Sequence, residues 1–501
     1  MRRRNLDLLI VLLGGGLAAC GFAPLNLWPL ALVGVAALAH VVFQSATLKR
    51  AFWMAWLWAV AHFTVGLNWI AHAFTYQDAM PHWFGYGAVV ALSLYLALFP
   101  ALGMVLAKWG SGERPIPFGF AFAACWALSE WLRGVAFTGF AWNPLGVVSL
   151  PMAELSQLSP FIGTTGLSFL LALTSASLWQ VASGWRTTPI VTLALVLVAA
   201  VLPLPAPPTA AEPGAPTLVV VQPNFSQDVK HGPDYGAQAW DRQVALTRAA
   251  RTPPGPRLIL WPEGAIEASP LEDPTAAPRV AGLLDPGDAL MAGGVTVSRD
   301  RFGIARSATN SVFAFDATGE VTGRYDKAHL VPYGEYLPMP TLLGALGLAR
   351  LVPGSVYYAP GPGPRSLDVP GFGRIGVQVC YEIIFSGEVL DRTRRPRLLF
   401  NPSNDAWFGA WGPPQHLAQA RLRAREEAVP IVRSTTNGVS AIVAANGALL
   451  ASIPRHEAGT LVSTLPPAGA PTLFSRVGNA LPLGGALLIL LAAVALGRRR
   501  V

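Results

Sequence analysis

The apolar residues of this chain are segregated along its length, and this segregation constrains the fold more than any other feature. Over residues 1–205 they form successive runs near the ~20 residues that a helix needs to cross a membrane. Residues 217–470 have the mixed composition of a globular domain, and one more apolar run covers 478–496. With 52% hydrophobic and only 13% charged residues, the chain is too apolar for a soluble protein of 501 residues. The sequence therefore predicts a polytopic α-helical membrane protein that carries one large extramembrane α/β domain.

The apolar runs predict about eight spans. We place them at 7–24, 28–45, 51–73, 86–107, 117–137, 159–182, 189–205 and 478–496. Lys and Arg fall in alternate loops, for example at Arg2, Lys49, Lys108, Arg186 and Arg498. Because cytoplasmic loops are enriched in these residues, both termini are expected in the cytoplasm and the globular domain outside it. The net charge of +8 is accordingly interpreted as a topology signal, and no nucleic-acid partner is expected.

The predicted organisation has four parts. Residues 1–205 form a seven-span domain, 206–216 a linker rich in Pro and Ala, 217–470 the globular domain, and 478–496 the last span. The segment Leu17-Ala18-Ala19-Cys20 after an Arg-rich start resembles a lipoprotein signal with its lipidation box. We favour a first membrane span, because further spans follow at once and the charge pattern needs this one.

The globular part alternates short β-rich runs with two helix-like stretches, which indicates a layered α/β domain. The expected strands are 217–222, 257–261, 289–297, 311–315, 374–379, 397–401, 431–434 and 440–444. A hairpin is expected around 317–319, and helices over 238–250 and 414–428. The stretch 335–358 is apolar and punctuated by Gly and Pro, and we interpret it as an arm that touches lipid and covers the site.

Three residues that could carry thioester chemistry follow strand-like runs. Cys380 ends GRIGVQVC, Glu263 follows LILWP, and Lys327 lies in YDKAHL. Acyl transfer through a cysteine needs a thiolate, a proton shuttle and a positive donor near the developing oxyanion. Cys380, Glu263 and Lys327 are expected to supply these in turn. A cysteine at a strand-to-helix turn lies near helix N-terminal amides, which predicts a lowered pKa for Cys380.

Several neighbouring residues are secondary candidates. Glu335 lies in PYGEYLP, and Tyr381 and Glu382 directly follow the cysteine, where Glu382 could orient Lys327 by a charge-assisted bond. His416 is interpreted as a structural hydrogen-bonding residue. The alternating arginines of 421–425 are interpreted most simply as a solvated helix face, with binding of an anionic lipid head group as the alternative. Metal-binding motifs are absent from the sequence, so no metal is expected.

Taken together, the motifs LILWPEGAIE, YDKAHLVPYGEYLP, VCYE, NPSNDAWFG, PQHLAQARLRARE and VRSTTNGVSA resemble the apolipoprotein N-acyltransferase family. This family is the membrane-embedded branch of the nitrilase, or carbon-nitrogen hydrolase, superfamily, and the resemblance covers essentially the whole chain. It implies a nitrilase-like αββα sandwich for the globular domain. It also implies a catalytic set of Glu263 as general base and acid, Lys327 as oxyanion stabiliser and Cys380 as nucleophile.

The resemblance extends to further positions. It implies supporting or substrate-binding roles for Glu335, Tyr381 and Glu382, and a site contact for Asn310. The chain departs from the family at His231, where the family often has a tryptophan, so any acyl-chain or gating role of that tryptophan is in doubt here.

The reaction implied by the resemblance is a ping-pong acyl transfer without a cofactor. The sn-1 acyl chain of a phospholipid, typically phosphatidylethanolamine, would pass to the cysteine. It would then pass to the N-terminal α-amine of a diacylglyceryl-cysteine apolipoprotein, which completes lipoprotein maturation. The implied location is the bacterial inner membrane, with the catalytic domain on the periplasmic side and the protein acting as a monomer.

Two other readings use the same residues differently. A membrane-tethered nitrilase or amidase would hydrolyse a small amide, with water as the acceptor. A non-enzymatic protein would bind lipid or lipoproteins through an inactive nitrilase fold. Eight spans exceed what an anchor needs, and the intact Glu263, Lys327 and Cys380 argue against an inactive fold.

Overall fold

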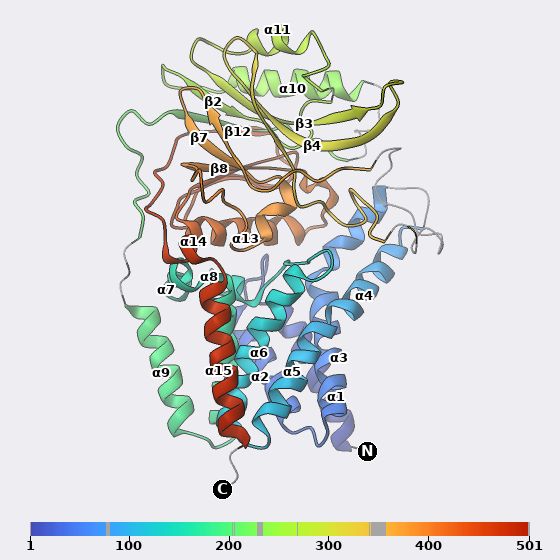
Figure 1. Cartoon of the computed structure of the whole chain (residues 1–501), viewed down its shortest axis with the longest axis vertical. Helices are drawn as coiled ribbons and strands as arrows, with labels where there is room; N and C mark the ends of the chain where they lie inside the picture. The colour runs from blue at the N-terminus through green and yellow to red at the C-terminus, as the bar shows by residue number, and fades with distance from the viewer. Residues whose placement is uncertain are drawn as a thin grey trace.

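The computed structural model of the chain describes residues 2–76, 81–202, 204, 206–227, 234–267, 269–339, 341 and 357–498. A bundle of helices forms one half of the molecule, and a domain with two β-sheets is seated on one end of it (Figure 1). Helices α1 (Arg2–Ala19) and α15 (Ala480–Arg498) belong to this bundle. Helix α1 begins, and helix α15 ends, at the end of the bundle that is remote from the sheets (Figure 1).

Each of the predicted apolar segments is helical. The remaining helices of the bundle are α2 (Trp28–Phe43), α3 (Leu48–Gly66) with η1 (Asn68–Tyr76), α4 (Phe84–Leu96), α5 (Leu98–Ser111), α6 (Pro115–Val135), η2 (Leu145–Ser149), α7 (Ala153–Ser156), α8 (Ser159–Ala182) and α9 (Thr187–Val201). Within the described residues, three helical stretches are long and apolar enough to cross a membrane: 84–111, 159–182 and 480–498. A fourth is added if α3 and η1, which are bent by 50°, count as one span. The helices at 5–19, 28–43 and 187–201 are apolar but shorter.

Two six-stranded mixed sheets form the domain above the bundle. The first has the order β12-β1-β2-β3-β4-β5 and the second β11-β10-β9-β8-β7-β6. The strands of the first are β1 (Thr217–Gln222), β2 (Arg257–Leu260), β3 (Ala289–Arg299), β4 (Ala305–Phe315), β5 (Val321–Asp326) and β12 (Gly459–Thr464). Those of the second are β6 (Ser366–Val369), β7 (Gly373–Val377), β8 (Leu398–Ser403), β9 (Ile431–Thr435), β10 (Ser440–Val443) and β11 (Leu449–Ile453).

The alternation of side chains along β1 explains how the layers are held together. Leu218 and Val220 join the core between the two sheets, whereas Val219 and Val221 join a separate core on the outer face. Successive side chains of a strand point to opposite faces, so a run of valines is buried on both sides. Helices α10 (Tyr235–Ala249) and α11 (Ala276–Ala281) cover the outer face of the first sheet (Figure 1). The result is an αββα sandwich whose second helical layer is α13 (Gly412–Glu427).

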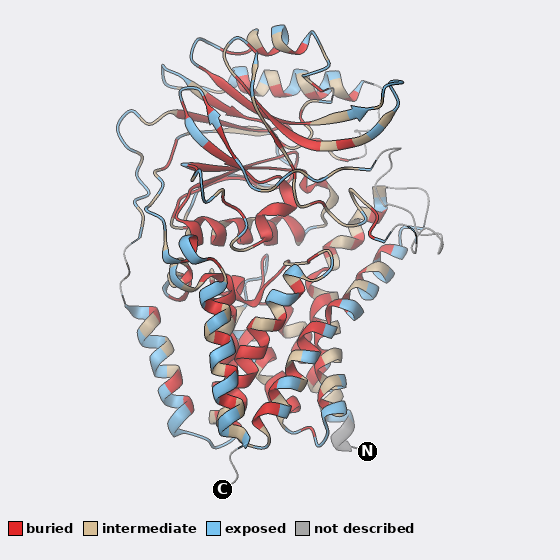
Figure 2. Ribbon diagram, in the orientation of Figure 1, coloured by how far each residue is buried: buried red, intermediate tan, exposed pale blue. Residues whose placement is uncertain are grey.

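Helix α13 also connects the sandwich to the bundle. One continuous cluster of buried apolar residues includes Leu399 and Ile431 of the second sheet, Leu422 of α13 and Leu171 of α8. Most of α13 is therefore buried, whereas α9 and α15 expose much of their surface (Figure 2). A buried hydrogen bond also joins the two halves: Trp142 Nε1 of the helical half donates to Gln415 Oε1 of α13 at 2.8 Å. The second sheet is thus packed on the bundle through α13.

The expected strands all occur, 217–222 with the predicted bounds and the others with shifted ends, and so does the hairpin of β4 and β5. Strands β6, β11 and β12 and helix α11 were not predicted. The reason is visible in β12, whose side chains are mostly half-buried or exposed, so that the strand lacks an apolar run. The proposed arm at 335–358 lies largely outside the described residues, as does His231.

Candidate active site

Cys380 lies in a sharp turn three residues after the end of β7. It begins the short 3₁₀-helix η4 (Cys380–Ile384), and its backbone has a φ of 51°. This left-handed conformation costs a non-glycine residue roughly 1–2 kcal/mol, so the surrounding structure must hold it in place. The side chain of Cys380 is buried.

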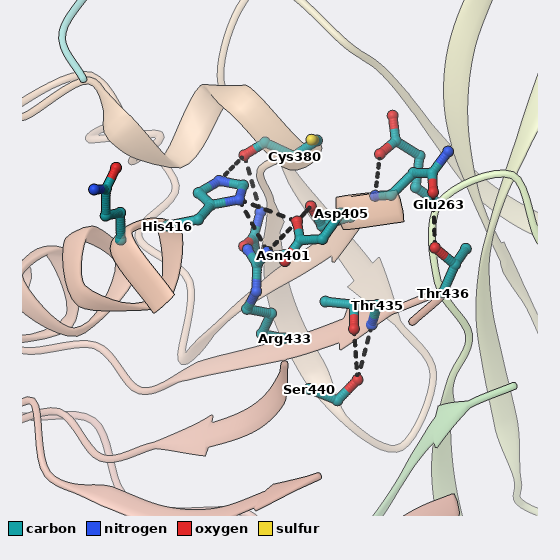
Figure 3. Close-up of polar contacts among 12 residues, drawn as sticks. Glu263, Cys380, Asn401, Asp405, His416, Arg433, Thr435, Thr436 and Ser440 are labelled. Carbon is teal, nitrogen blue, oxygen red and sulfur yellow. Dashed lines mark hydrogen bonds and ion pairs between the residues drawn. The ribbon is translucent and has the colours of Figure 1, made fainter. Parts of the chain in front are cut away.

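A fully buried network holds the backbone of this turn (Figure 3). His416, on α13, places Nε2 3.0 Å from the carbonyl oxygen of Cys380. Its Nδ1 lies 2.9 Å from an Nη2 donor of Arg433. Arg433 in turn forms bonds of 2.6 and 2.5 Å to the two carboxylate oxygens of Asp405 and one of 2.5 Å to Asn401 Oδ1.

These partners determine the tautomer of His416. A carbonyl oxygen only accepts, so Nε2 must carry the proton, and Nδ1 then accepts from Arg433. Burial and the neighbouring Arg433 lower the pKa of His416, which is consistent with a neutral ring. The network therefore presents an N–H group to the Cys380 carbonyl.

The three buried groups Cys380, Asp405 and His416 bring their potential ligand atoms within 4.8 Å of one another, which is also a spacing that a metal ion could use. However, both oxygens of Asp405 are bound by Arg433, and both ring nitrogens of His416 have partners. The positive charge of Arg433 in the same cluster would repel a cation. This arrangement fits a hydrogen-bonded support for the cysteine turn.

The other half of the site comes from the first sheet. Glu263 follows β2, Asn310 lies on β4 and Lys327 follows β5. Asn310 Nδ2 donates to Glu263 at 2.7 Å and to Glu335 at 2.9 Å, so one amide holds both carboxylates. Glu263 also accepts a 2.6 Å bond from the backbone N–H of Asn404.

Lys327 is almost fully buried between these acids. Its Nζ is 2.9 Å from a carboxylate oxygen of Glu335 and 3.9 Å from one of Glu263. Burial by itself would lower the pKa of Lys327, but the two carboxylates outweigh it and raise that pKa above its ordinary value. The site therefore contains a permanently charged ammonium group.

The expectation of a lowered cysteine pKa is wrong. Burial raises the pKa of the Cys380 thiol, and the charge of Glu263 adds to this, while Lys327 acts in the opposite direction. The helix that follows has only five residues, so its N-terminal field is too weak to overcome desolvation. The resting sulfur is therefore a neutral thiol that needs a proton acceptor before it can attack.

Glu382 connects the two halves of the site. Its carboxylate accepts bonds from the backbone N–H groups of Ala328 at 2.7 Å and of Val379 at 2.6 Å, and from Tyr325 Oη at 2.8 Å. The expected direct bond from Glu382 is not what holds Lys327, because the ammonium group lies 2.9 Å from a carboxylate oxygen of Glu335. Glu382 instead fixes the backbone on either side of the site, one residue after Lys327 and one before Cys380.

Tyr381 and His329 face the helical bundle. Tyr381 Oη donates to the carbonyl oxygen of Gly139 at 3.2 Å, and His329 Nε2 lies 3.1 Å from that of Thr138. The His329 ring stacks on Phe385 with 3.7 Å between the ring centroids. The loop that follows α6 is therefore in direct contact with the residues beside Cys380 and Lys327.

The sequence alone missed Asp405 and Arg433 as members of the site. A usable signal exists: Arg433 directly follows the apolar pair Ile431-Val432 in a strand-like run, and an arginine is rarely buried unless it is paired. The solvated face expected for 421–425 is also wrong, because Arg423 is fully buried and only its neighbours Arg421 and Arg425 keep partial exposure. Two of its partners, Thr164 and Ile384, come from distant segments, which local charge alternation could not reveal.

Comparison with known proteins agrees with this architecture. The chain matches the family model for the apolipoprotein N-acyltransferase N-terminal domain over residues 14–177 and that for carbon-nitrogen hydrolase over 181–471. It is 33% identical to an apolipoprotein N-acyltransferase of Rhodopseudomonas palustris over 98% of this chain and 95% of the relative. A protein of the same name from Bradyrhizobium diazoefficiens has the same identity and coverage, and one from Rhizobium rhizogenes is 35% identical over 83% of this chain and 80% of its own. The chain therefore belongs to the apolipoprotein N-acyltransferase family and contains a carbon-nitrogen hydrolase domain.

Proposed function

We propose that this protein is an N-acyltransferase of lipoprotein maturation. It would move the sn-1 acyl chain of a phospholipid, through a thioester on Cys380, to the α-amine of a diacylglyceryl-cysteine apolipoprotein. The observation that carries the proposal is a buried neutral thiol and a buried ammonium group that share a site with the largely buried carboxylate of Glu263. Membership of the family supports both the donor and the acceptor class.

In the first half-reaction, Glu263 accepts the thiol proton as the sulfur of Cys380 attacks the ester carbonyl. The raised pKa of the thiol makes this transfer necessary, since the thiolate is the nucleophile. The charge that develops on the carbonyl oxygen is stabilised by the Lys327 ammonium group and the backbone N–H of Tyr381. Collapse breaks the ester C–O bond, and Glu263 returns the proton to the lysophospholipid that leaves.

In the second half-reaction, the amine of the apolipoprotein attacks the thioester carbonyl. Glu263 takes a proton from the attacking nitrogen, and Lys327 again stabilises the oxyanion. The C–S bond breaks, an amide forms, and the proton returns to the sulfur of Cys380. The burial of Cys380 limits access of water to the thioester, which favours aminolysis over hydrolysis.

The remaining residues position this set. Asn310 holds Glu263 and Glu335 at a fixed separation, and Glu335 fixes the Lys327 ammonium. Tyr381 and Glu382 hold the turn of the cysteine against the bundle and against the Lys327 loop, as described above.

The proposed setting is the bacterial inner membrane. We propose eight spans, with both termini in the cytoplasm and the 217–470 domain in the periplasm, joined by a linker at 206–216. The common location of the start of α1 and the end of α15, at the end of the bundle remote from the sheets, supports this arrangement (Figure 1). Phosphatidylethanolamine is the proposed donor, and the protein is proposed to act as a monomer.

Intact mass spectrometry tests the function directly. Purified protein is incubated with a phospholipid of defined acyl chains in detergent, beside Cys380→Ala. The expected result is one added acyl mass on the unmodified chain alone, which a diacylated lipopeptide with a free N-terminal amine removes. Removal by water at the same rate would instead identify a hydrolase, and a folded protein that forms no adduct with several phospholipids would refute acyl transfer.

A further inference from the structure

Helix α8 is broken near its start. Gly163 has a φ of 61° and a ψ of −173°, so a second helical half begins at Thr164. A side chain at Gly163 would be strained by this φ, and its Cβ would lie 2.1 Å from the ring of Phe474. The break leaves backbone N–H groups without a partner inside the helix, at the positive end of the second half.

A carboxylate from the catalytic half occupies this break. Glu426, near the end of α13, accepts bonds from the backbone N–H of Thr164 at 2.5 Å and from its hydroxyl at 2.6 Å. The same oxygen accepts a 2.9 Å bond from Ser386 Oγ. Glu426 is fully buried, so its charge is surrounded by these donors rather than by water.

Arg423 completes the contact in the other direction. Its Nε lies 2.6 Å from Glu426 Oε2, and its Nη2 donates to the Thr164 hydroxyl. Its Nη1 donates to the carbonyl oxygen of Ile384 at 3.0 Å. Ile384 is the last residue of η4, which Cys380 begins, so the pair contacts both the broken bundle helix and the helix of the proposed nucleophile.

We propose that Arg423 and Glu426 are positioning residues for acyl transfer, which set the place of the Cys380 turn relative to the bundle; this inference rests on the proposed function. A buried ion pair adds little net stability over apolar residues of similar volume, because desolvation of both charges offsets their attraction. The ion pair differs from apolar residues in its geometric effect. It links Thr164, Ile384 and Ser386 by directed hydrogen bonds, which apolar side chains cannot form.

The experiment separates positioning from stability. Glu426→Gln removes the nearest counter-ion of the buried Arg423 charge, and we expect both a lower melting temperature in detergent and slower acyl-enzyme formation. The double variant R423M/E426L removes both charges. We expect its melting temperature to return to within a few degrees of the unmodified protein, while acyl-enzyme formation remains at least ~10-fold slower. Recovery of both quantities in the double variant would overturn the proposal.

A milder variant tests the same contact if the double variant does not fold. Thr164→Val keeps the shape of the side chain but removes the hydroxyl that bonds Glu426 and Arg423. Thr174→Val is the matched control, since Thr174 lies on the same helix and, among the described residues, its hydroxyl bonds only the Leu170 carbonyl oxygen. We expect acylation to slow at least threefold in Thr164→Val alone; equal rates in the two variants would overturn the proposal.

The alkylation of Cys380 by iodoacetamide gives a readout that does not depend on the proposed substrates. Each protein compared also carries C20S and C125S, so that Cys380 is the cysteine whose alkylation is measured. If the pair positions the turn, the alkylation rate changes in Thr164→Val and in R423M/E426L, and not in Thr174→Val. An unmodified protein that forms no acyl-enzyme would refute the proposed function, while an unchanged alkylation rate would refute the positioning role.

Discussion

The Asp405–Arg433 pair allows a quantitative test of how the cysteine turn is held. In Arg433→Met the side chain keeps much of its volume but loses its charge and all its donors. Asp405 is then a fully buried carboxylate without its cation, and the oxygen of Asn401 loses a 2.5 Å bond. Breaking a buried pair costs about 3–5 kcal/mol, and an unsatisfied buried acceptor about 1 kcal/mol or more. The expected loss of unfolding free energy is therefore roughly 4–6 kcal/mol.

His416 makes this loss dependent on pH. With Arg433 gone, Nδ1 of His416 faces only Asp405 Oδ1, 3.2 Å away, and can take up a proton. The pKa of His416 in the variant should then rise above its unfolded value instead of lying below it, as it does beside Arg433. A histidine whose pKa is raised in the folded state stabilises the fold at pH values below its unfolded-state pKa of about 6.5, and this stabilisation is lost as the pH rises. The deficit of Arg433→Met should be larger at pH 8 than at pH 6.

Thermal unfolding in detergent at pH 6 and pH 8 measures both effects. A deficit of roughly 4–6 kcal/mol in a domain of this size corresponds to a fall of the melting temperature by about 10–20 °C. The double variant D405N/R433M removes the stranded charge and should recover part of the loss at pH 8 and show less pH dependence. A deficit under ~1 kcal/mol, or one equal at the two pH values, would refute the reasoning.

The other predictions concern catalysis, with acyl-enzyme formation as the measurement. Acylation should slow as the pH falls below about 7, because burial raises the pKa of Glu382 to about 7 and its protonation removes a charged acceptor from the Ala328 and Val379 N–H groups. Because the pKa of Glu382 is higher in the folded protein than in the unfolded chain, protonation stabilises the fold by about 3 kcal/mol as the pH falls from 7 towards 4.5. Acylation rate and stability should therefore change in opposite directions. An acylation rate that stays constant down to pH 5.5 would contradict the role of the Glu382 charge. His416→Leu should slow acylation at least ~10-fold and His416→Gln, which keeps an N–H donor for the Cys380 carbonyl, clearly less; equal effects would show that the donor is unimportant. Asn310→Asp should slow it ~100-fold and more than Asn310→Leu, because it adds a third carboxylate beside two others, and a smaller loss for Asp would refute this role.

Much of the site could be predicted because strand ends and chemistry coincide in it. Cys380, Glu263 and Lys327 all follow strands: Glu263 and Lys327 follow strands of the first sheet, and Cys380 follows one of the second. Asn310 was expected only from the family resemblance, and the structure gives it a specific place between the carboxylates of Glu263 and Glu335. The helical segments could be predicted because apolar runs of this length have few other uses.

The failures share one physical cause. The lowered pKa expected for Cys380 followed from its place before a helix, but the pKa depends on desolvation and on charges from other segments. Arg423 was assigned to a solvated face from local charge alternation, but the face it occupies is covered by α8 of the bundle. In both cases one deciding partner lies more than a hundred residues away in the chain: Glu263 for Cys380, and Thr164 for Arg423.

The sequence by itself determined the division into a helical half and an α/β half, and which thiol, carboxylate and ammonium groups are the candidates for catalysis. These follow from composition, periodicity and side-chain chemistry, which are local properties of the chain. Only the tertiary structure decided which charges are buried and with which partners: Lys327 with Glu335, Asp405 with Arg433, and Glu426 with the broken helix α8. Electrostatic energies depend on distance and on exclusion of water, and both are set only when distant segments pack together.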